Sequence, residues 1–196
     1  MNEGTPRIEQ LKNKVSDLYL AKDPNRADWA DWLFENHIFV VAKNAEAIAK
    51  RYGAKADLVV AAALLHDIAD AVMQREDEHH EEKSYEIAKE LLGESGFSHE
   101  EIPLVIDAIK HHACHGEDLP ETLEGKVMAT ADGMAHLQTD FYDFALGVLL
   151  PIESPKKIRA WALPKIERDF RKKIFFDEIR TELTGDYERV KKLFEI

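Results

Sequence analysis

The stretch VVAAALLHDIADAV occupies residues 59–72 and is apolar at all but three positions, His66, Asp67 and Asp70. A helix that is apolar nearly all round is normally buried. A charged carboxylate inside such a helix carries a large desolvation cost unless it is paired or bound to a cation. Asp70 follows the pair by three and four residues and shares its helix face. The stretch therefore predicts a buried helix whose polar face meets a partner, although one such pair would also fit a hydrogen-bonded core histidine beside a solvent edge.

Apolar residues recur with helical spacing along almost the whole chain, and no segment alternates convincingly as a strand would. We therefore expect an all-α fold with at least seven helices. The expected helices cover about residues 6–22, 28–52, 56–73, 81–92, 98–112, 123–137, 154–183 and 186–196. The segment from Ser98 to Glu101 has the form of a capping box, and the tail helix should bend or split at Pro164.

Length and composition limit the class of protein and its partners. The 196 residues fit one domain, and a hydrophobic share of 45% is enough for a sizeable core. The formal net charge of −12 repels nucleic acid and anionic membranes, so neither is expected as a partner. A single cysteine, Cys114, fits a reducing compartment, and the sequence shows no signal peptide and no membrane-spanning run. We therefore expect a soluble, cytoplasmic protein.

The histidines are not spread evenly along the chain. Eight of the nine fall between His66 and His136, and the ninth, His37, lies in an amphipathic helical segment. Histidine and carboxylate side chains from several helices can converge in a bundle core and hold metal ions. This donor mixture suits one or two divalent transition-metal ions such as Fe, Mn, Co, Ni or Zn, whereas Mg prefers sites made mostly of oxygen.

The order of these residues resembles the HD-domain superfamily of metal-dependent phosphohydrolases. The pattern of that family is a histidine, then a histidine–aspartate pair, then an aspartate. Here the pattern corresponds to His37, His66-Asp67 and Asp132. The resemblance covers about residues 30–140, which is over half of the chain.

The resemblance also implies a fold and a domain organisation. An HD-type helical bundle over residues 1–196 would form one domain, with a C-terminal helical extension in residues 154–196. The apolar positions of that extension need a surface to bury against, so we expect its helices to pack on the core. Nothing in the sequence fixes the oligomeric state, and a homodimer stays open.

Two further histidines match the branch of the family that binds two metal ions. One opens the helix after the pair, here His80, and another ends an apolar helix, here His112. The resemblance then implies six ligands, with Asp67 bridging two ions. These ligands are His37, His66, Asp67, His80, His112 and Asp132.

Neighbouring residues compete for two of these ligand positions, because adjacent helical side chains point about 100° apart. The competitors are His79 for His80, and His111 or His115 for His112. Without both added histidines, four ligands and one ion remain.

The segment after the pair departs from the pattern of many relatives. Where those relatives have Gly-Lys, this chain continues as HDIAD, so Asp70 stands where a lysine would be. Some nucleotide-hydrolysing members carry an acidic residue there as a catalytic acid or base. The resemblance therefore implies catalytic roles for Asp67 and Asp70. The segment HHACHGEDL lacks the signature of the branch that hydrolyses cyclic di-GMP, and we do not predict that substrate.

The function implied by the resemblance is that of a metal-dependent phosphohydrolase. A metal-activated hydroxide would attack a phosphomonoester or phosphodiester of a nucleotide or another small phosphorylated metabolite. Lys165 and Arg168 could reach over the pocket from the tail, whereas His99 and His136 are expected on the surface or behind the ligands. Two alternatives remain, a di-iron HD-type oxygenase and a metal-holding regulatory module without turnover.

Overall fold

The computed structural model describes residues 5–195, in which helical elements are joined by loops. The α-helices are α1 (Pro6–Leu20), α2 (Ala30–Leu33), α3 (Phe39–Tyr52), α4 (Ala56–Leu65), α5 (His80–Glu94), α6 (Glu101–His111), α7 (Leu123–Gln138), α8 (Phe141–Leu149), α9 (Pro155–Arg171), α10 (Asp177–Glu182) and α11 (Thr184–Lys192). A π-helix, η1 (Phe34–Ile38), and a 3-10 helix, η2 (Ile68–Ala71), accompany them. No strand occurs in the described range, so the all-α prediction is confirmed. Residues 1–4 and 196, which the expected domain and last helix include, lie outside the described residues.

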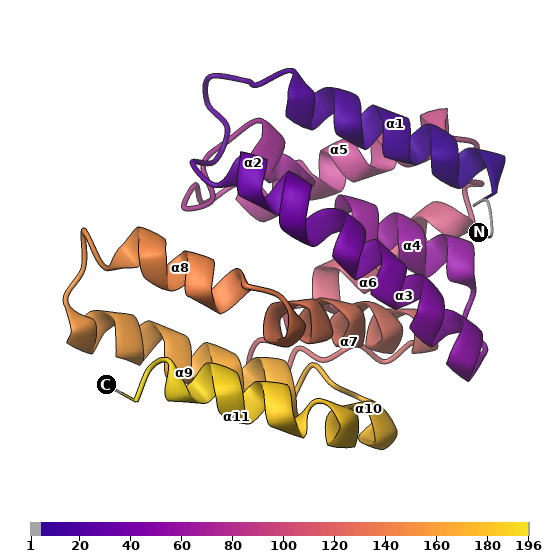
Figure 1. Ribbon diagram of the computed structural model, residues 1–196. Coiled ribbons are helices and arrows are strands. Elements are labelled where there is room, and N and C mark those ends of the chain that lie inside the picture. Colours follow the sequence, from indigo (N-terminus) through magenta and orange to yellow (C-terminus); the bar gives the residue numbers. More distant parts are fainter. Residues whose placement is uncertain (1–4, 196) are drawn as a thin grey trace.

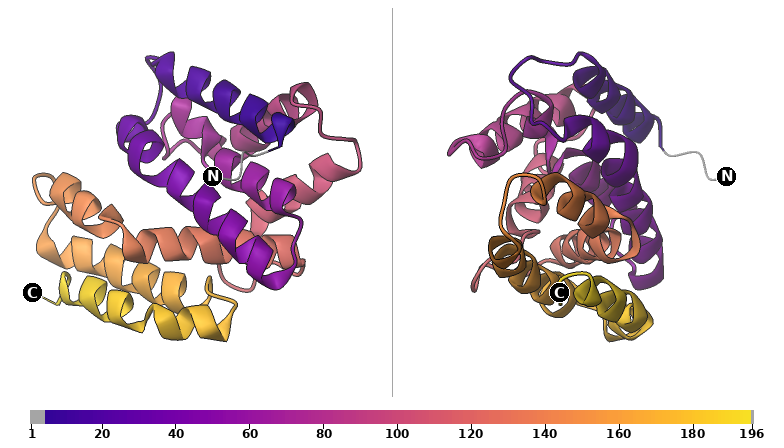
Figure 2. Two further views of the ribbon diagram at one scale, coloured as in Figure 1. Left: turned by 45° about the vertical axis from the view of Figure 1, so that its right-hand side comes forward. Right: turned by 60° about the vertical axis from the view of Figure 1, so that its left-hand side comes forward.

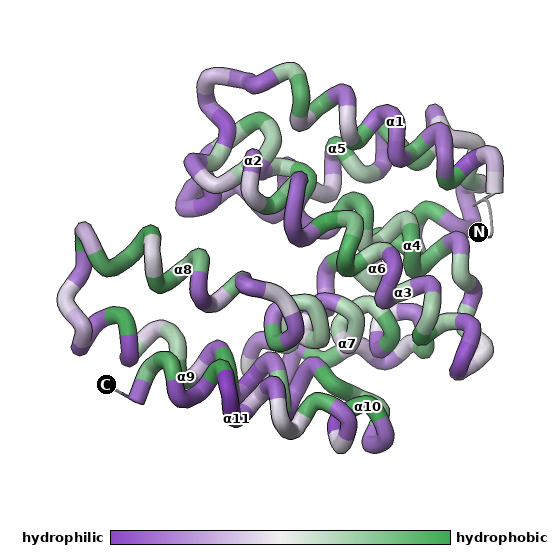
Figure 3. The backbone as a smooth tube through the Cα atoms, in the orientation of Figure 1, coloured by the Kyte–Doolittle hydropathy of each residue, from purple (hydrophilic) through white to green (hydrophobic). Residues whose placement is uncertain are grey.

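Helix α4 lies in the middle of the bundle (Figure 1). Every residue from Leu58 to Leu65 is buried, and the helix is hydrophobic over most of its length (Figure 3). Helices α1, α3, α6 and α7 pack around it, so its stability comes from packing rather than from one amphipathic face. Helix α4 is apolar but has only 10 residues. No helix in the described part of the chain is long and apolar enough to cross a membrane.

The helix that begins at Ala56 is shorter than the sequence predicts. We expected one helix over residues 56–73, but α4 ends at Leu65 and the 3-10 helix η2 follows. Between the two, Asp67 has φ −117° and ψ 27°, outside the α-helical region. The break places His66 and Asp67 at a helix end rather than in the middle of a helix.

The predicted helix over residues 28–52 exists, but its geometry changes along its length. Helix α2 passes directly into the π-helix η1, and η1 passes directly into α3. Short π-helical turns are rare and occur frequently at functional sites. His37 lies in this turn and is buried. The irregular backbone therefore coincides with the first residue of the ligand pattern.

The predicted capping box is present just before α6, and a threonine side chain caps the start of α7. The backbone N–H of Ser98 donates to Glu101 Oε2 (2.9 Å), and the N–H of Glu101 donates to Ser98 Oγ (3.3 Å), which confirms the capping box. Thr122 Oγ1 accepts from the N–H of Gly125 (3.1 Å) at the start of α7. Helix α8 is not among the predicted helices. Its sequence FYDFALGVL is short and largely apolar, and periodicity alone does not identify such a run as a helix.

The C-terminal helices form a layer against α7 (Figures 1 and 2). Both α9 and α11 pack on α7. The approach is closest at Gly133, where an added Cβ would lie 2.9 Å from the backbone oxygen of Asp169 and 3.0 Å from Cβ of Lys173. Only a residue without a side chain fits there, so α7 and α9 can approach closely behind the middle of α7.

Helix α9 runs from Pro155 to Arg171, so a split at Pro164 is wrong, whereas a bend there stays a prediction. The expected helix over residues 154–183 divides instead between Arg171 and Asp177. A proline in a helix interior costs about 3 kcal/mol or more. Side chains on both sides of it, including Ile158 and Ile166, are buried in the packed layer. Their burial offsets the cost of the proline and keeps the helix continuous.

Replacing Gly133 with alanine tests the packing of α7 on this layer. The new methyl group would meet the backbone of Asp169, which cannot move aside as a flexible side chain can. Overpacking of this kind costs about 1–3 kcal/mol, and we expect Gly133→Ala to lower the free energy of unfolding in urea by that amount. Gly147→Ala is the matched control, because Gly147 is helical and has nothing within 4 Å of an added Cβ. An equal loss of stability in the control would contradict the packing account.

Candidate metal centre

Three side chains from separate helical elements meet in the core. His37 comes from η1, His66 from the end of α4, and Asp132 from the middle of α7. A donor atom of each lies within 4.8 Å of the others, and all three residues are buried. His37 Nε2 is 3.1 Å and His66 Nε2 is 3.8 Å from Asp132 Oδ1. Ligands about 2.0–2.2 Å from one ion have a mutual spacing of this order.

These donor atoms have no hydrogen-bond partner among the described residues. The unpaired atoms are both ring nitrogens of His37, Nε2 of His66 and Oδ1 of Asp132. His37 Nε2 and Asp132 Oδ1 are close, but their geometry is not that of a hydrogen bond. Leaving one buried polar atom unpaired costs about 1–3 kcal/mol. A cation among these atoms would remove much of that cost, so the residues present fit a metal ion.

Two histidines are oriented through their other ring nitrogen. Nδ1 of His66 lies 2.8 Å from the carbonyl oxygen of Ala63, and Nδ1 of His112 lies 2.5 Å from that of Ile109. A carbonyl oxygen can only accept, so each Nδ1 carries the proton and each Nε2 keeps its lone pair. Metal-binding histidines are commonly held in this way. Both Nε2 atoms are therefore able to bind an ion.

His112 and Asp67 form a second group with His66. One donor atom of each lies within 4.8 Å of the others, and the ring centroids of His66 and His112 are 5.1 Å apart. Because His66 has a single free lone pair, it can bind only one ion. The two donor groups share His66. They are therefore better explained by one ion bound to His66 than by two ions that both bind it. The structure brings together five of the six predicted ligands, namely His37, His66, Asp67, His112 and Asp132.

Two histidines of this cluster, His37 and His112, are in the protonation state that a metal ion needs. Burial lowers the pKa of His37. Burial also lowers the pKa of His112 to about 3, and the nearby charge of Lys173 adds to the effect. Both rings are therefore neutral near pH 7, which is the form that binds metal.

The two carboxyls of the cluster are ionised. Burial alone would raise their pKa values, but neighbouring charges outweigh it. Arg75 is the main charge that holds the pKa of Asp67 well below its usual value. His136 and Lys173 do the same for the pKa of Asp132. Two ionised carboxylates beside neutral imidazoles make a site that attracts a cation.

Asp132 is held from behind by the C-terminal layer. Its Oδ2 pairs with the ammonium group of Lys173, which lies just after α9 and is buried. His136, one turn along α7, places Nε2 at 3.4 Å from Asp132 Oδ1 and Nδ1 at 3.0 Å from Asp169 Oδ2. Asp169 also accepts a hydrogen bond from the Tyr142 hydroxyl (2.5 Å). The tail therefore positions a residue of the cluster.

Sequence reasoning missed Asp169 and Lys173. Both lie in a stretch that alternates charged and apolar residues, a pattern typical of an amphipathic surface helix. One signal could have found them, since Asp169 lies on the buried face of α9 with Ile166 and Phe170. A charge on such a face is almost never left unpaired. His136, expected on the surface or behind the ligands, lies behind them.

Asp70 and His80 lie beside the cluster and contact each other. His80 Nε2 is 2.9 Å from Asp70 Oδ1, and neither residue belongs to either donor group. Asp70 is fully buried, and both of its oxygens also accept from Arg75, which pairs with Asp67 at 2.9 Å. A catalytic role for Asp70 stays a prediction, and its observed contacts are with Arg75 and His80. His80 as a ligand stays a prediction. Arg75 was missed because its loop has no periodic pattern.

The competing histidines have other surroundings. The side chain of His79 is 68% exposed. His111 Nδ1 pairs with Asp118 Oδ1 at 2.6 Å, and His115 Nδ1 accepts from Arg168 Nη1 at 3.1 Å. None of the three belongs to either donor group. Between His111 and His112, the structure therefore favours His112 as the ligand.

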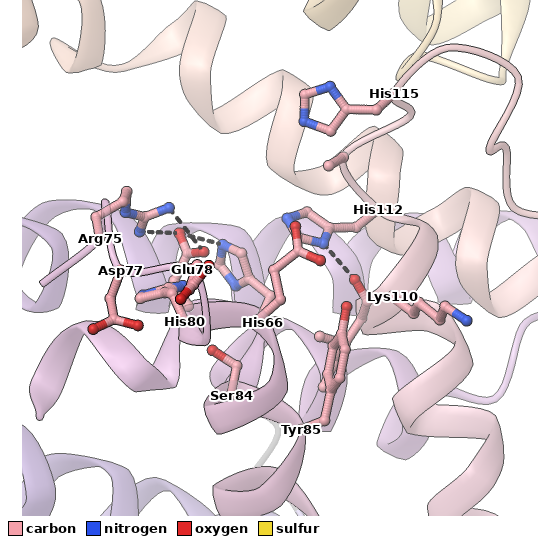
Figure 4. A pocket seen from close by; sticks show the side chains of 14 residues that line it. His66, Arg75, Asp77, Glu78, His80, Ser84, Tyr85, Lys110, His112 and His115 are labelled. Atoms are coloured by element: carbon pink, nitrogen blue, oxygen red, sulfur yellow. Dashed lines mark hydrogen bonds and ion pairs between the residues drawn. The ribbon is translucent and has the colours of Figure 1, made fainter. Parts of the chain in front are cut away.

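Two cavities open onto the cluster. The first, of about 330 Å³, is lined by His66 and His112 and by the loop that carries Arg75, which lies across His66 from His112 (Figure 4). The second, of about 240 Å³, lies on the side of the tail and is lined by Lys165 and Arg168, as the sequence suggested for these two residues. The residues that line both cavities are Asp67, Arg75, His112, Ala113 and His115. A molecule in either cavity therefore has access to the donor cluster.

Residues 34–136 match the sequence model of the HD domain, and this range is more than half of the 196-residue chain. The chain belongs to the HD domain family. No match was found among curated proteins or among solved structures. HD domains are helical, bind divalent metal ions and are generally metal-dependent hydrolases. The HD-domain range contains the whole donor cluster, whereas the supporting residues Lys165, Arg168, Asp169 and Lys173 lie beyond it.

Metal binding should stabilise the folded protein, because it pairs donor atoms that are otherwise buried and unpaired. A ligand at 100 times its dissociation constant adds about 2.7 kcal/mol to the free energy of unfolding. We expect Mn²⁺ to raise the Tm of chelator-treated protein, and His66→Ala to lose most of this increase. His79→Ala is the matched control, since its exposed side chain faces no donor. Calorimetry that shows the same increase in His66→Ala as in wild type would contradict the assignment.

Proposed function

We propose that the protein is a metal-dependent phosphohydrolase that cleaves a small phosphoester. The observation that carries the proposal is the set of buried, unpaired donor atoms on His37, His66 and Asp132, next to two cavities. Membership of the HD domain family supports it. A regulatory module without turnover is less well supported, because such a module does not need donors that open onto cavities.

The tail-side cavity has the charge that a phosphate group needs. The chain as a whole is acidic, but Arg75, Lys165 and Arg168 all line this cavity. Arg168 uses one nitrogen on His115 (3.1 Å), and its planar guanidinium has further N–H groups for phosphoryl oxygens. Asp169 holds Lys165 at 3.2 Å. We therefore expect the phosphate to bind on this side, with its phosphorus next to the donor cluster.

When bound, the metal ion supplies Lewis-acid activation of water and offsets negative charge on the phosphoryl group. The side chains of the protein position the ligands of the ion and bind the phosphate. Arg75 and Lys173 hold Asp67 and Asp132 in place by ion pairs. Lys165 and Arg168 orient the phosphate and stabilise the charge that spreads over its oxygens during transfer.

Asp70 takes a positioning role in this proposal. Both of its oxygens accept from Arg75, so Asp70 fixes the guanidinium that pairs with Asp67. It lines neither cavity and is fully buried, so a proton for the leaving oxygen has to come from another group. His115 lines both cavities, but its Nδ1 accepts from Arg168 and burial lowers its pKa, so it stays neutral and this proton comes from water.

A di-iron oxygenase is the weaker candidate. It needs a full set of donors for a second ion, which the resemblance assigns to Asp67, His80 and His112. The remaining predicted ligand, His80, is engaged with Asp70 at 2.9 Å. The cationic wall of the tail-side cavity, in contrast, suits a phosphate.

A panel of phosphate esters tests the proposal directly. Metal-free protein would be assayed on 4-nitrophenyl phosphate, bis(4-nitrophenyl) phosphate and nucleoside monophosphates, with Mn, Fe, Co, Ni, Zn or Mg added. We expect hydrolysis with at least one transition metal and much less with Mg, because the donor set is rich in histidine. Arg168→Ala should raise KM for the ester and also lower kcat, because Arg168 both binds the phosphate and stabilises its charge during transfer. A complete lack of hydrolysis with every metal and ester would overturn the proposal.

Two aspartate variants separate metal binding from positioning. Asp67→Ala removes a donor and should abolish both metal retention and hydrolysis. Asp70→Asn should retain metal but lower kcat about 10–100-fold, the usual cost of losing a group that holds a ligand or its partner. Asp17→Asn, on the exposed face of α1, is the control and should match wild type in both assays. Metal loss in Asp70→Asn, measured by elemental analysis, would make Asp70 a ligand instead.

A further inference from the structure

An apolar groove lies next to the tail-side cavity, between the α8–α9 hairpin and the loop before α2. Its volume is about 600 Å³, which is in the range of pockets for small organic molecules. The apolar part of its wall consists of Ala27, Trp29, Phe144, Val148, Leu149, Ile152, Ile158 and Trp161. Several of these side chains are well exposed, including Val148 at 42% and Ile152 at 72%. Clustered exposed apolar side chains commonly mark a binding surface.

The apolar groove continues from the tail-side cavity. Trp29 and Trp161 line both of them, so the two hollows meet at these tryptophans. Lys165 and Arg168 line the tail-side cavity but not the groove. A phosphoester with its phosphate on those two cations would therefore direct the rest of the molecule towards the tryptophans.

The charges of the groove exclude a phosphate. Its one lysine, Lys157, is paired with Glu153 at 2.9 Å. The other charged residues of its wall are Asp28 and Glu76, which are both acidic and exposed. An anionic group is therefore attracted to the tail-side cavity and repelled from the groove. This asymmetry fixes the direction in which an anionic substrate with an apolar end would bind.

The groove suits an apolar group better than a nucleobase. A nucleobase could stack on the tryptophans, but its edge carries several hydrogen-bonding groups. The apolar side chains of the groove, among them Val148, Leu149 and Ile158, offer no partners for such groups. Of the polar side chains in its wall, the Gln74 amide already donates to the carbonyl oxygen of Arg26 (2.7 Å), and Lys157 is paired with Glu153. Burying polar atoms without partners costs free energy, whereas burying an apolar ring or chain is favourable.

We propose that the apolar groove binds the alcohol part of the substrate, and that this part is a large, uncharged aromatic or aliphatic group. This inference rests on the proposed function, because it takes the phosphate to lie at the donor cluster. It narrows the substrate to phosphoesters that have one strongly apolar end.

Calorimetric binding to metal-free, full-length protein tests the groove without turnover. The probes are 1-naphthyl phosphate, glycerol phosphate and adenosine monophosphate, which share the phosphate and differ in the attached group. We expect 1-naphthyl phosphate to bind at least about tenfold more tightly than glycerol phosphate. Val148→Asp should remove this preference, because it places a charge in the groove without changing the residues that bind phosphate. Leu104→Ala is the control, since Leu104 is 40% exposed on α6 and lines none of the three hollows.

Three outcomes would overturn the inference, and a fourth would separate it from the proposed function. Equal binding of the naphthyl and glycerol esters would show that the groove does not take the alcohol part. Tighter binding of adenosine monophosphate that Val148→Asp weakens would make the occupant a nucleobase. A dimer in wild type that Val148→Asp converts to a monomer, with no preference for naphthyl phosphate, would make the groove an interface between copies. Retained preference without hydrolysis in any metal would instead refute the proposed function and leave the groove assignment standing.

Discussion

The structure depends on a small set of polar atoms that are buried without protein partners. Nε2 of His37, Nε2 of His66 and Oδ1 of Asp132 face one another in a mostly apolar core. At about 1–3 kcal/mol each, such atoms cost a large share of the roughly 5–15 kcal/mol by which a domain is stable. A protein can keep such unpaired donor atoms when a bound cation pairs with them and when that cation serves the function of the protein.

The remaining architecture serves to bring these atoms together and keep them in place. The packing of four helices around α4 holds His66 at the end of a rigid element. The π-helical turn holds His37 in the core, and the ion pair with Lys173 holds Asp132 from the side of the tail. The close approach at Gly133 lets α9 come near enough for that contact. The C-terminal layer thus supports the centre and also provides the cations of the adjoining cavity.

The sequence predicts the parts of this account that depend on periodicity and residue order. The buried α4, the capping box at Ser98 and the all-α class follow from local patterns, and both the fold class and the capping box are confirmed. The convergence of His37, His66 and Asp132 was predicted from their order in a family pattern. Contacts between distant segments were not predictable, because helical spacing does not state which helix a face will meet. Asp169 and Lys173 are of this kind, and so is the bond between His80 and Asp70.

Anomalous X-ray diffraction from crystals grown with Mn²⁺ and measured at the Mn edge is the most direct measurement of the central claim. We expect one strong anomalous peak in contact with the five clustered donors His37, His66, Asp67, His112 and Asp132, and a weaker peak or none near His80 and Asp70. The absence of a peak within binding distance of His66 Nε2 and Asp132 Oδ1, or a peak held by surface residues alone, would contradict it.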